Sequence, residues 1–214
     1  MFEHLYDILM SDVDYEKMFL QIAPHLKKDD QILDAGCGSG YFLIELIKAG
    51  YNPIGIDLSS SMLSIALNHL QEQGLYAMLY EHDLRKPLSI QVDVICAMFD
   101  VVNYFKGVKQ LFKNIKKALL PQGRFIFDLY KEEVLMTYDG YEEKDIEPIP
   151  YVWQIHSDQE KFIHDIYYQE NQDHIVQYIY PLDYYQKILL DLGFDIEIIP
   201  SVDSRKHLIV ATVR

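Results

Sequence analysis

The sequence predicts an α/β fold with a doubly wound, seven-stranded, Rossmann-like sheet. Short apolar segments with strand character alternate with helical segments from residue 31 to residue 129, which is typical of a parallel sheet covered by helices on both faces. Residues 92–98 are almost wholly apolar, as expected of a strand buried on both faces. Glycine occupies every second position of residues 36–40, where the first predicted strand turns into a helix.

The predicted strands and helices of this region are bounded by glycine, proline and serine. The five strands, expected to be parallel, span residues 31–35, 53–57, 75–80, 92–98 and 124–129. The helices between them span residues 41–49, about 60–73 and 106–120. Residues 6–26 form one or two helices ahead of the first strand, with a break at Pro24.

The pattern changes after residue 130. Residues 131–180 are rich in tyrosine, isoleucine and acidic side chains, and apolar and polar residues alternate in 162–168 and 174–180. The alternation predicts an antiparallel hairpin, with a turn in 170–173 and a third strand at 151–156.

The end of the chain predicts one helix and an antiparallel pair of strands. The helix begins at Pro181 and ends at Leu192, and the two strands span residues 194–199 and 207–213. The pair adds an antiparallel edge to the parallel sheet. We therefore expect residues 1–214 to form a single domain, in which residues 131–180 are a β-rich insert or cover.

Composition disfavours several classes of function. The 214 residues carry a formal net charge of −14, which makes nucleic acid an unfavourable partner, because DNA and RNA are bound by lysine and arginine. The acidity is also consistent with a role in solubility alone. No apolar run is long enough to span a bilayer, and the N-terminus lacks the features of a signal peptide. Cys37 and Cys96 are expected to be reduced and buried, with no disulfide or metal site. The sequence thus predicts a cytoplasmic protein.

The glycine loop indicates a nucleoside ligand without phosphates. Gly36, Gly38 and Gly40 have the spacing G-x-G-x-G, and not the G-x-G-x-x-G of a dinucleotide loop. S-adenosylmethionine fits this difference, because its carboxylate suits a helix N-terminus. Its ammonium would meet a backbone carbonyl or Asp34, and Cys37 lies within the loop. A glycine-rich turn without any ligand is the alternative.

Two further carboxylates follow strands two and three. Asp57 ends the second strand, where an acidic residue about 20 positions after a glycine loop binds ribose hydroxyls, and Leu58 and Met62 would cover the adenine. Asp83 would accept the adenine amino group, while the backbone of Leu84 meets a ring nitrogen. The alternatives are that Asp57 caps the next helix and that Asp83 is a solvated turn residue.

Together these segments resemble the class I S-adenosylmethionine-dependent methyltransferases. The likeness covers nearly all of the chain and implies the sheet order 3-2-1-4-5-7-6. Its motifs are the glycine motif at 34–40, the ribose motif at 55–63 and the turn before strand five at 119–125.

The chain resembles most closely a group of small bacterial methyltransferases with no assigned substrate. This closer likeness depends on residues 6–10, 99–104, 151–154 and 163–165. The chain departs from the group at three positions, where a serine, a histidine and an arginine are usual. These positions are Val101, Val176 and Tyr178.

The segment 99–104 is predicted to face the methyl acceptor, since it follows strand four at the edge where ligands bind in open α/β sheets. Asp100 would take a proton from the acceptor or bind its amine. Asn103 and Tyr104 would orient the acceptor or line the sulfonium, and Phe99 would contact the donor. The alternative is that Asp100 and Asn103 only hold the turn.

The N-terminal tyrosines Tyr6 and Tyr15 are predicted to form part of a lid over the donor, with a packed amphipathic helix as the alternative. His156, His164 and His174 lie in the insert without the tight spacing of a metal site. The tyrosines of the insert would form a substrate cover or the surface of a homodimer.

The sequence therefore predicts a methyltransferase that transfers a methyl group in line to a small-molecule acceptor. Proximity and alignment would supply most of the catalysis, because the donor is already activated by its charge. The main alternative is a non-catalytic S-adenosylmethionine-binding protein whose insert recruits a protein partner. An NAD-dependent oxidoreductase is a weaker alternative, which the glycine spacing opposes.

Overall fold

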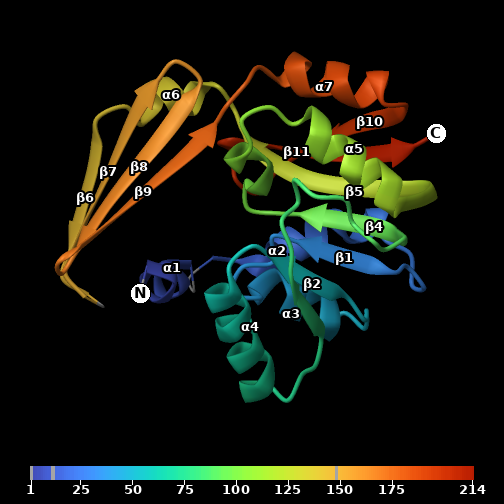
Figure 1. Ribbon diagram of the computed structural model, residues 1–214, viewed down its shortest axis with the longest axis horizontal. Helices are drawn as coiled ribbons and strands as arrows, with labels where there is room; N and C mark the ends of the chain where they lie inside the picture. The colour runs from blue at the N-terminus through green and yellow to red at the C-terminus, as the bar shows by residue number, and fades with distance from the viewer. Residues whose placement is uncertain (1, 11–12, 148) are drawn as a thin grey trace.

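The computed structural model describes residues 2–10, 13–147 and 149–214 of the chain, and it contains two sheets (Figure 1). The seven-stranded sheet has the order β10-β11-β5-β4-β1-β2-β3. Its strands are β1 (Ile32–Ala35), β2 (Ile54–Asp57), β3 (Met78–Glu81), β4 (Val92–Ala97), β5 (Leu119–Tyr130), β10 (Phe194–Ile199) and β11 (Lys206–Val213).

This topology confirms the predicted order 3-2-1-4-5-7-6, in which β10 and β11 are the sixth and seventh strands. The strands β1 to β5 pair in parallel, and β11 pairs antiparallel with both β5 and β10. All five parallel strands therefore end at one edge of the sheet, where the loops that follow them meet.

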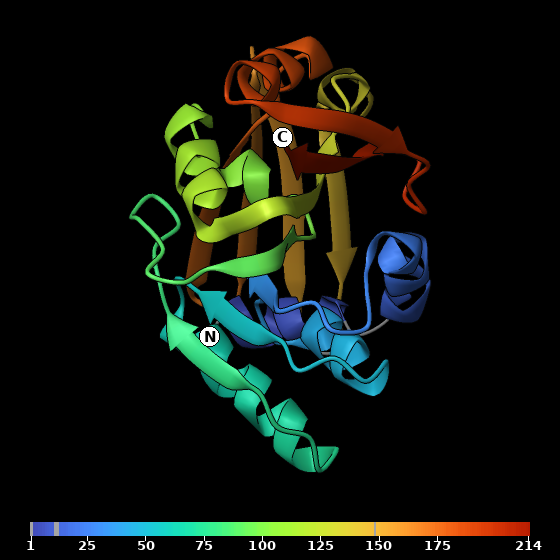
Figure 2. The same cartoon turned by 90° about the vertical axis from the view of Figure 1, so that its right-hand side faces the viewer.

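Helices cover both faces of this sheet (Figures 1 and 2). One face packs on α5 (Lys109–Ala118) and α7 (Leu182–Asp191), through Phe112, Tyr185 and Leu189. The other face packs on α2 (Tyr15–Ile22) and α3 (Tyr41–Lys48), and α4 (Ser60–Glu72) lies beside α3. The remaining helices are α1 (Phe2–Met10), η1 (Ala23–His25), η2 (Val101–Tyr104) and α6 (Glu133–Thr137).

Among the predicted boundaries that are wrong, two concern where a strand of the sheet begins. The helix predicted to reach residue 120 ends at Ala118, and residues 121–123 already belong to β5, where the register against β4 shifts. The third strand begins at Met78 and not at Leu75, because β3 is an edge strand that pairs only from Met78, opposite Ile54. Tertiary pairing thus decides both boundaries.

The insert forms a four-stranded antiparallel sheet in the order β6-β7-β8-β9. The predicted hairpin and third strand are present as β7 (Tyr151–Asp158), β8 (Lys161–Tyr168) and β9 (Asn171–Tyr178). The turn between β8 and β9 falls at residues 169–170, where Gln169 has a positive φ of 51°. The prediction missed β6 (Tyr141–Asp145) because this strand is short, mostly charged and mostly exposed.

Figure 1 shows the insert sheet beside α1, at the end of the large sheet toward which β4 points. The inward face of the insert packs against α1 through Leu5, Tyr151 and Ile166. No helix of the described residues is long and apolar enough to cross a bilayer. Cys37 and Cys96 are free thiols and are buried.

Candidate active site

The glycine loop between β1 and α3 lies directly against the segment that follows β4. Gly36 has a φ of +81°, and a Cβ atom there would lie 2.7 Å from Cγ2 of Val101. Gly38 has a φ of +53° and faces open space. The loop thus leaves room for a ligand at Gly38 and brings that ligand next to the end of β4.

Asp57 links the glycine loop to the next helix. One of its oxygens, Oδ2, accepts a hydrogen bond from the Gly38 amide at 2.8 Å, and Oδ1 accepts one from the Ser59 amide, also at 2.8 Å. The cap of α4 is the hydroxyl of Ser59, which accepts a hydrogen bond from the Met62 amide. The structure therefore places Asp57 at the loop, and its role toward ribose stays a prediction.

Asp34 is the residue of the loop region that most clearly requires a partner. It is 2% exposed, and its Oδ2 has no hydrogen-bond partner among the described residues. Burial, together with the charge of Asp57, raises the pKa of Asp34 to about 8. A cation placed here would stabilise the ionised form. The predicted ammonium group of S-adenosylmethionine therefore fits the residues that are present.

The residues predicted to surround the adenine are only partly brought together. Leu58 is 60% exposed, and Leu84 is buried in the main core. Both oxygens of Asp83 accept hydrogen bonds from Nε of Arg85, at 2.8 and 3.0 Å. Asp83 is thus already paired, and its adenine role stays a prediction. The side chain of Cys37 is buried, and burial raises the pKa of its thiol.

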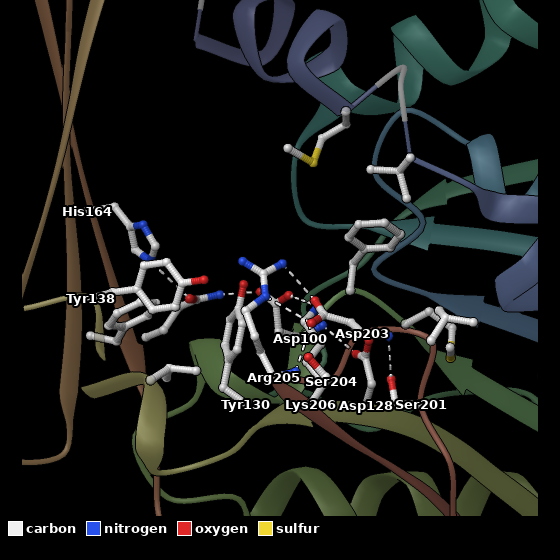
Figure 3. A pocket seen from close by; sticks show the side chains of 18 of the residues that line it. Asp100, Asp128, Tyr130, Tyr138, His164, Ser201, Asp203, Ser204, Arg205 and Lys206 are labelled. Atoms are coloured by element: carbon white, nitrogen blue, oxygen red, sulfur yellow. Dashed lines mark hydrogen bonds and ion pairs between the residues drawn. The ribbon is translucent and has the colours of Figure 1, made fainter. Parts of the chain in front are cut away.

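A cavity of about 630 Å³ lies between the edge of the large sheet, α1 and the inward face of the insert. Figure 3 shows the polar side chains at its floor. Phe99 and Asp100, which line it, have positive φ angles of 65° and 51°. Such conformations are strained for residues other than glycine and are typical of functional sites. Aromatic residues of the wall include Tyr6, Tyr104, Tyr130, Tyr138 and Trp153.

The floor of the cavity is a buried cluster of two carboxylates and one ammonium. Nζ of Lys206 donates to Oδ1 of Asp100 and lies 3.4 Å from Oδ2 of Asp128, and the Asp100 amide donates to Oδ1 of Asp128 at 2.6 Å. Burial raises the pKa of Asp128, an effect that Lys206 opposes and the charge of Asp100 reinforces. The sequence did not single out Lys206 or Asp128. Asp128 is a charged residue within the apolar end of β5, and Lys206 is the first residue of β11.

A directed chain of hydrogen bonds joins this cluster to the insert. Trp153 Nε1 donates to His164 Nδ1 at 3.1 Å, His164 Nε2 lies 3.2 Å from Gln177 Oε1, and Gln177 Nε2 donates to Asp100 Oδ2. An indole nitrogen only donates, so the histidine proton must be on Nε2. His164 is then neutral, and burial lowers its pKa. The insert and the large sheet are thus connected through Asp100.

The side chain of Asn103 links two backbone groups, one in β9 and one in β5. Its Nδ2 donates to the carbonyl of Tyr178 at 2.9 Å, and its Oδ1 accepts from the amide of Tyr130 at 3.0 Å. The residue is fully buried, whereas Tyr104 lines the cavity and is 46% exposed. Any direct contact of Asn103 with an acceptor stays a prediction.

The N-terminal helices pack against the cavity and the glycine loop, and their role as a lid stays a prediction. Tyr6 lines the cavity, and burial raises the pKa of its hydroxyl well above the usual value. Tyr15 stacks on Tyr41 with ring centroids 5.0 Å apart and lies 5.1 Å from the ring of Phe99. Asp7 of α1 pairs with His69 of α4, whose other ring nitrogen lies 2.9 Å from the carbonyl of Ser39 in the glycine loop. Helix α1 is thus anchored to the loop.

The clustered histidines of the insert do not form a metal centre. His156 and His174 bind separate oxygens of Asp165 on the outer face, while His164 belongs to the inward face. In the part of the chain that the structure describes, no three side chains of histidine, cysteine, aspartate or glutamate are arranged to hold a metal ion.

Comparison with known proteins defines the class. Residues 10–198 match the methyltransferase domain family. YqeM of Bacillus subtilis (strain 168), provisionally named a methyltransferase, is 30% identical in an alignment 214 positions long, which covers 91% of this chain and 85% of YqeM.

Solved structures of methyltransferases share the fold, and two of them serve as examples. An S-adenosylmethionine-dependent methyltransferase from Clostridium acetobutylicum ATCC 824 gives a TM-score of 0.85 at 23% identity, covering 99% of this chain and 97% of that chain. CalS10 from Micromonospora echinaspora is an amino pentose methyltransferase solved with S-adenosylmethionine bound. It gives a TM-score of 0.80 at 17% identity, and the match covers 99% of this chain and 96% of CalS10.

The fold and the glycine loop are those of a class I S-adenosylmethionine-dependent methyltransferase. The chain belongs to the methyltransferase domain family. The predictions of this class, of a methyltransferase enzyme and of S-adenosylmethionine as its cofactor are confirmed.

Proposed function

We propose that this methyltransferase transfers the methyl group of S-adenosylmethionine to a small molecule bound in the cavity between the large sheet and the insert. The observation that carries the proposal is the close approach of Gly36 to Val101, next to which a Cβ atom would not fit. Val101 directly follows Phe99 and Asp100, which line the cavity, and this supports a donor bound beside it. A volume of about 630 Å³ suits a small molecule. The known substrate class of CalS10, an amino pentose, is also small.

On the donor side, this chain contributes binding and orientation. S-adenosylmethionine supplies a methyl group that its positive sulfur already activates. Asp34 would hold the ammonium, the helix N-terminus of α3 would favour the carboxylate, and Asp57 would bind the ribose. Phe99 and Tyr15, whose rings lie 5.1 Å apart, would limit the movement of the donor.

On the acceptor side, Asp100 and Tyr104 would align the attacking atom with the methyl group. Helix α1 and the insert flank the cavity and would limit, but not abolish, the access of water to it. We expect the reaction to take place in the cytoplasm and not on nucleic acid, given the net charge of −14. A homodimer formed through the insert stays a prediction.

The test is release of S-adenosylhomocysteine by the purified full chain, supplied with S-adenosylmethionine and fractions of a small-metabolite extract. We expect donor binding by calorimetry and a fraction that stimulates release. Mass spectrometry would then show one acceptor heavier by a methyl group. Donor binding together with turnover only on added proteins would contradict the small-molecule proposal. Donor binding without turnover on any acceptor would favour the non-catalytic alternative.

A further inference from the structure

More acidic than basic side chains line the cavity. Among the described residues that line it, five are acidic and three are basic. Arg205 forms an ion pair with Asp203 at 2.8 Å. Lys206 is the ion-pair partner of both Asp100 and Asp128. Glu143 accepts its hydrogen bonds from the uncharged hydroxyls of Tyr141 and Tyr151.

The excess negative charge is greatest at the buried floor. Asp100 and Asp128 are 8% and 3% exposed, and they share the single ammonium of Lys206. Burying a carboxylate without a full counter-charge is unfavourable. The raised pKa of Asp128 reflects the same imbalance. A ligand with one positive charge would restore neutrality at this floor.

The walls next to the floor suit a cation as well. The ammonium of Lys206 already lies 5.1 Å from the ring centroid of Phe99 and 4.9 Å from that of Tyr130. Tyr104 and Trp153 add further aromatic faces to the cavity. Aromatic rings attract ammonium groups through their negative faces, most strongly where water is excluded.

The hydrogen bonds of Asp100 disfavour acceptors that need a strong base. Its two oxygens already accept hydrogen bonds from Lys206 and from Gln177. The direction of the Gln177 bond is fixed by His164 and, through it, by the donor-only indole of Trp153. A hydroxyl acceptor has to lose its proton as it attacks, and a proton taken up by Asp100 would displace one of these bonds. An amine attacks with its own lone pair.

We infer that the acceptor carries an amine, which this cavity binds as an ammonium ion between Asp100 and the aromatic walls. The inference rests on the proposed function, because it names the acceptor class of the same cavity. After losing a proton to solvent, the neutral amine forms the C–N bond with its lone pair, while the C–S bond of the donor breaks and its electron pair returns to sulfur. The positive charge moves to nitrogen, where the floor of the cavity compensates it. The methylated ammonium then releases a proton to solvent.

The test compares two probes of the same shape, choline and its neutral isostere 3,3-dimethylbutan-1-ol. Each is titrated into the full chain saturated with S-adenosylhomocysteine. We expect choline to bind at least about tenfold more tightly, since one desolvated cation–π contact with a charge partner has that magnitude. In Asp100→Asn the preference should be lost. Equal affinities for the two probes in the unmodified protein would overturn the inference.

Asp165→Asn is the matched control, because it removes a buried carboxylate from the outer face of the insert. It should keep the full preference for choline. If Asp100→Asn does not fold, Tyr104→Leu tests the inference instead. The side chain of Tyr104 is half-exposed, so its replacement should leave the fold intact. That variant should bind choline more weakly and the alcohol as before, and unchanged choline binding would contradict the inference.

A further comparison separates this inference from the proposed function. Failure of S-adenosylmethionine to bind would remove the proposed function, whereas the choline preference, measured without nucleotide, would still test the cavity. Donor binding and turnover on a hydroxyl, thiol or carboxylate acceptor, without turnover on amines, would overturn only the amine inference.

Discussion

Lys206 of β11 and Asp100 after β4 form a buried ion pair across 106 residues of chain (Figure 3). The side chains are 5% and 11% exposed. The pair fixes the carboxylate at the floor of the cavity, and Gln177 continues the connection into the insert. The last strand of the large sheet and the insert therefore both determine the geometry of the acceptor site.

Loss of the Lys206 ammonium should destabilise the protein strongly. Lys206→Met leaves Asp100 and Asp128 buried without a counter-charge. We expect the free energy of unfolding to fall by about 3–5 kcal/mol. Urea denaturation followed by circular dichroism measures the change. Lys48→Met, which breaks only the exposed pair with Glu45, should cost about 0.5 kcal/mol or less. Equal effects of the two substitutions would contradict the importance of the buried pair.

Binding of the donor at pH 7 should release a proton from Asp34. Its pKa of about 8 means that the carboxyl is protonated in the free protein at pH 7. An ammonium group beside it would favour the ionised form. Calorimetry of S-adenosylmethionine binding in buffers of different ionisation enthalpy measures the protons released, and we expect close to one. Asp34→Asn should abolish this buffer dependence, and buffer-independent heat in the unmodified protein would remove Asp34 from the ammonium site.

Asp34 also gives the free protein a distinct pH dependence. Because its pKa is raised in the folded state, the folded protein holds a proton that the unfolded chain loses above about pH 4. The contribution of Asp34 to the free energy of unfolding therefore falls as pH rises from about 4 to about 8, with a slope near 1.4 kcal/mol per pH unit. In Asp34→Asn this dependence of the free energy of unfolding on pH should be absent. Denaturation curves recorded at several pH values between about 4 and 8 measure it.

His164 should make the protein sensitive to mild acid. Burial lowers its pKa in the folded state, so below about pH 6.5 the unfolded chain binds a proton that the folded protein does not. The contribution of His164 to the free energy of unfolding should therefore fall as pH decreases from 7.5 to 5.5, opposite in direction to the contribution of Asp34. His164→Gln keeps both hydrogen-bonding functions without titrating, and its loss of stability over this range should be smaller.

The control for this prediction is His174→Gln on the outer face, where the imidazole is 56% exposed. The prediction is checked by the denaturation midpoints of the unmodified protein, His164→Gln and His174→Gln, each measured at pH 7.5 and at pH 5.5. An acid sensitivity that persists unchanged in His164→Gln would show that the hydrogen-bond chain from Trp153 does not restrict the protonation of His164.

Removal of the Asp57 carboxylate should weaken donor binding. Asp57→Ala breaks the hydrogen bond from the Gly38 amide and removes the predicted ribose ligand, so we expect the dissociation constant of S-adenosylmethionine to rise at least about tenfold. Isothermal titration calorimetry measures it. Glu81→Ala, which removes an exposed carboxylate at the end of the neighbouring strand, should bind the donor normally. Normal binding by Asp57→Ala would exclude its ribose role.

The donor side of the site could be predicted because its residues follow consecutive strands. Asp34, Gly36, Gly38 and Asp57 lie at the ends of β1 and β2, and parallel strands bring their carboxyl ends together whatever the details of packing. Asp83 shows the limit of this reasoning, since its position is as expected but its oxygens are taken by Arg85.

The acceptor side depended on contacts that local sequence does not report. Asp128 is an isolated charge in an apolar part of β5, whereas Lys206 begins β11 directly after Arg205, and only the antiparallel pairing of β11 with β5 brings them together. Asn103, predicted to face the acceptor, holds two backbone groups from β5 and β9. His164 and His174 have the same residue type and lie in neighbouring strands, yet the alternation of side chains puts them on opposite faces.

By itself, the sequence determined the layered fold, the strand order through family likeness, and the donor loop. These depend on hydrophobic periodicity, glycine spacing and strand ends, which are local properties of the chain. Only the tertiary structure decided the acceptor cavity, its unbalanced charge and the coupling of the insert to Asp100. The physical reason is that burial and charge pairing are properties of neighbours in space, and Asp100 meets its partners 77 and 106 residues away.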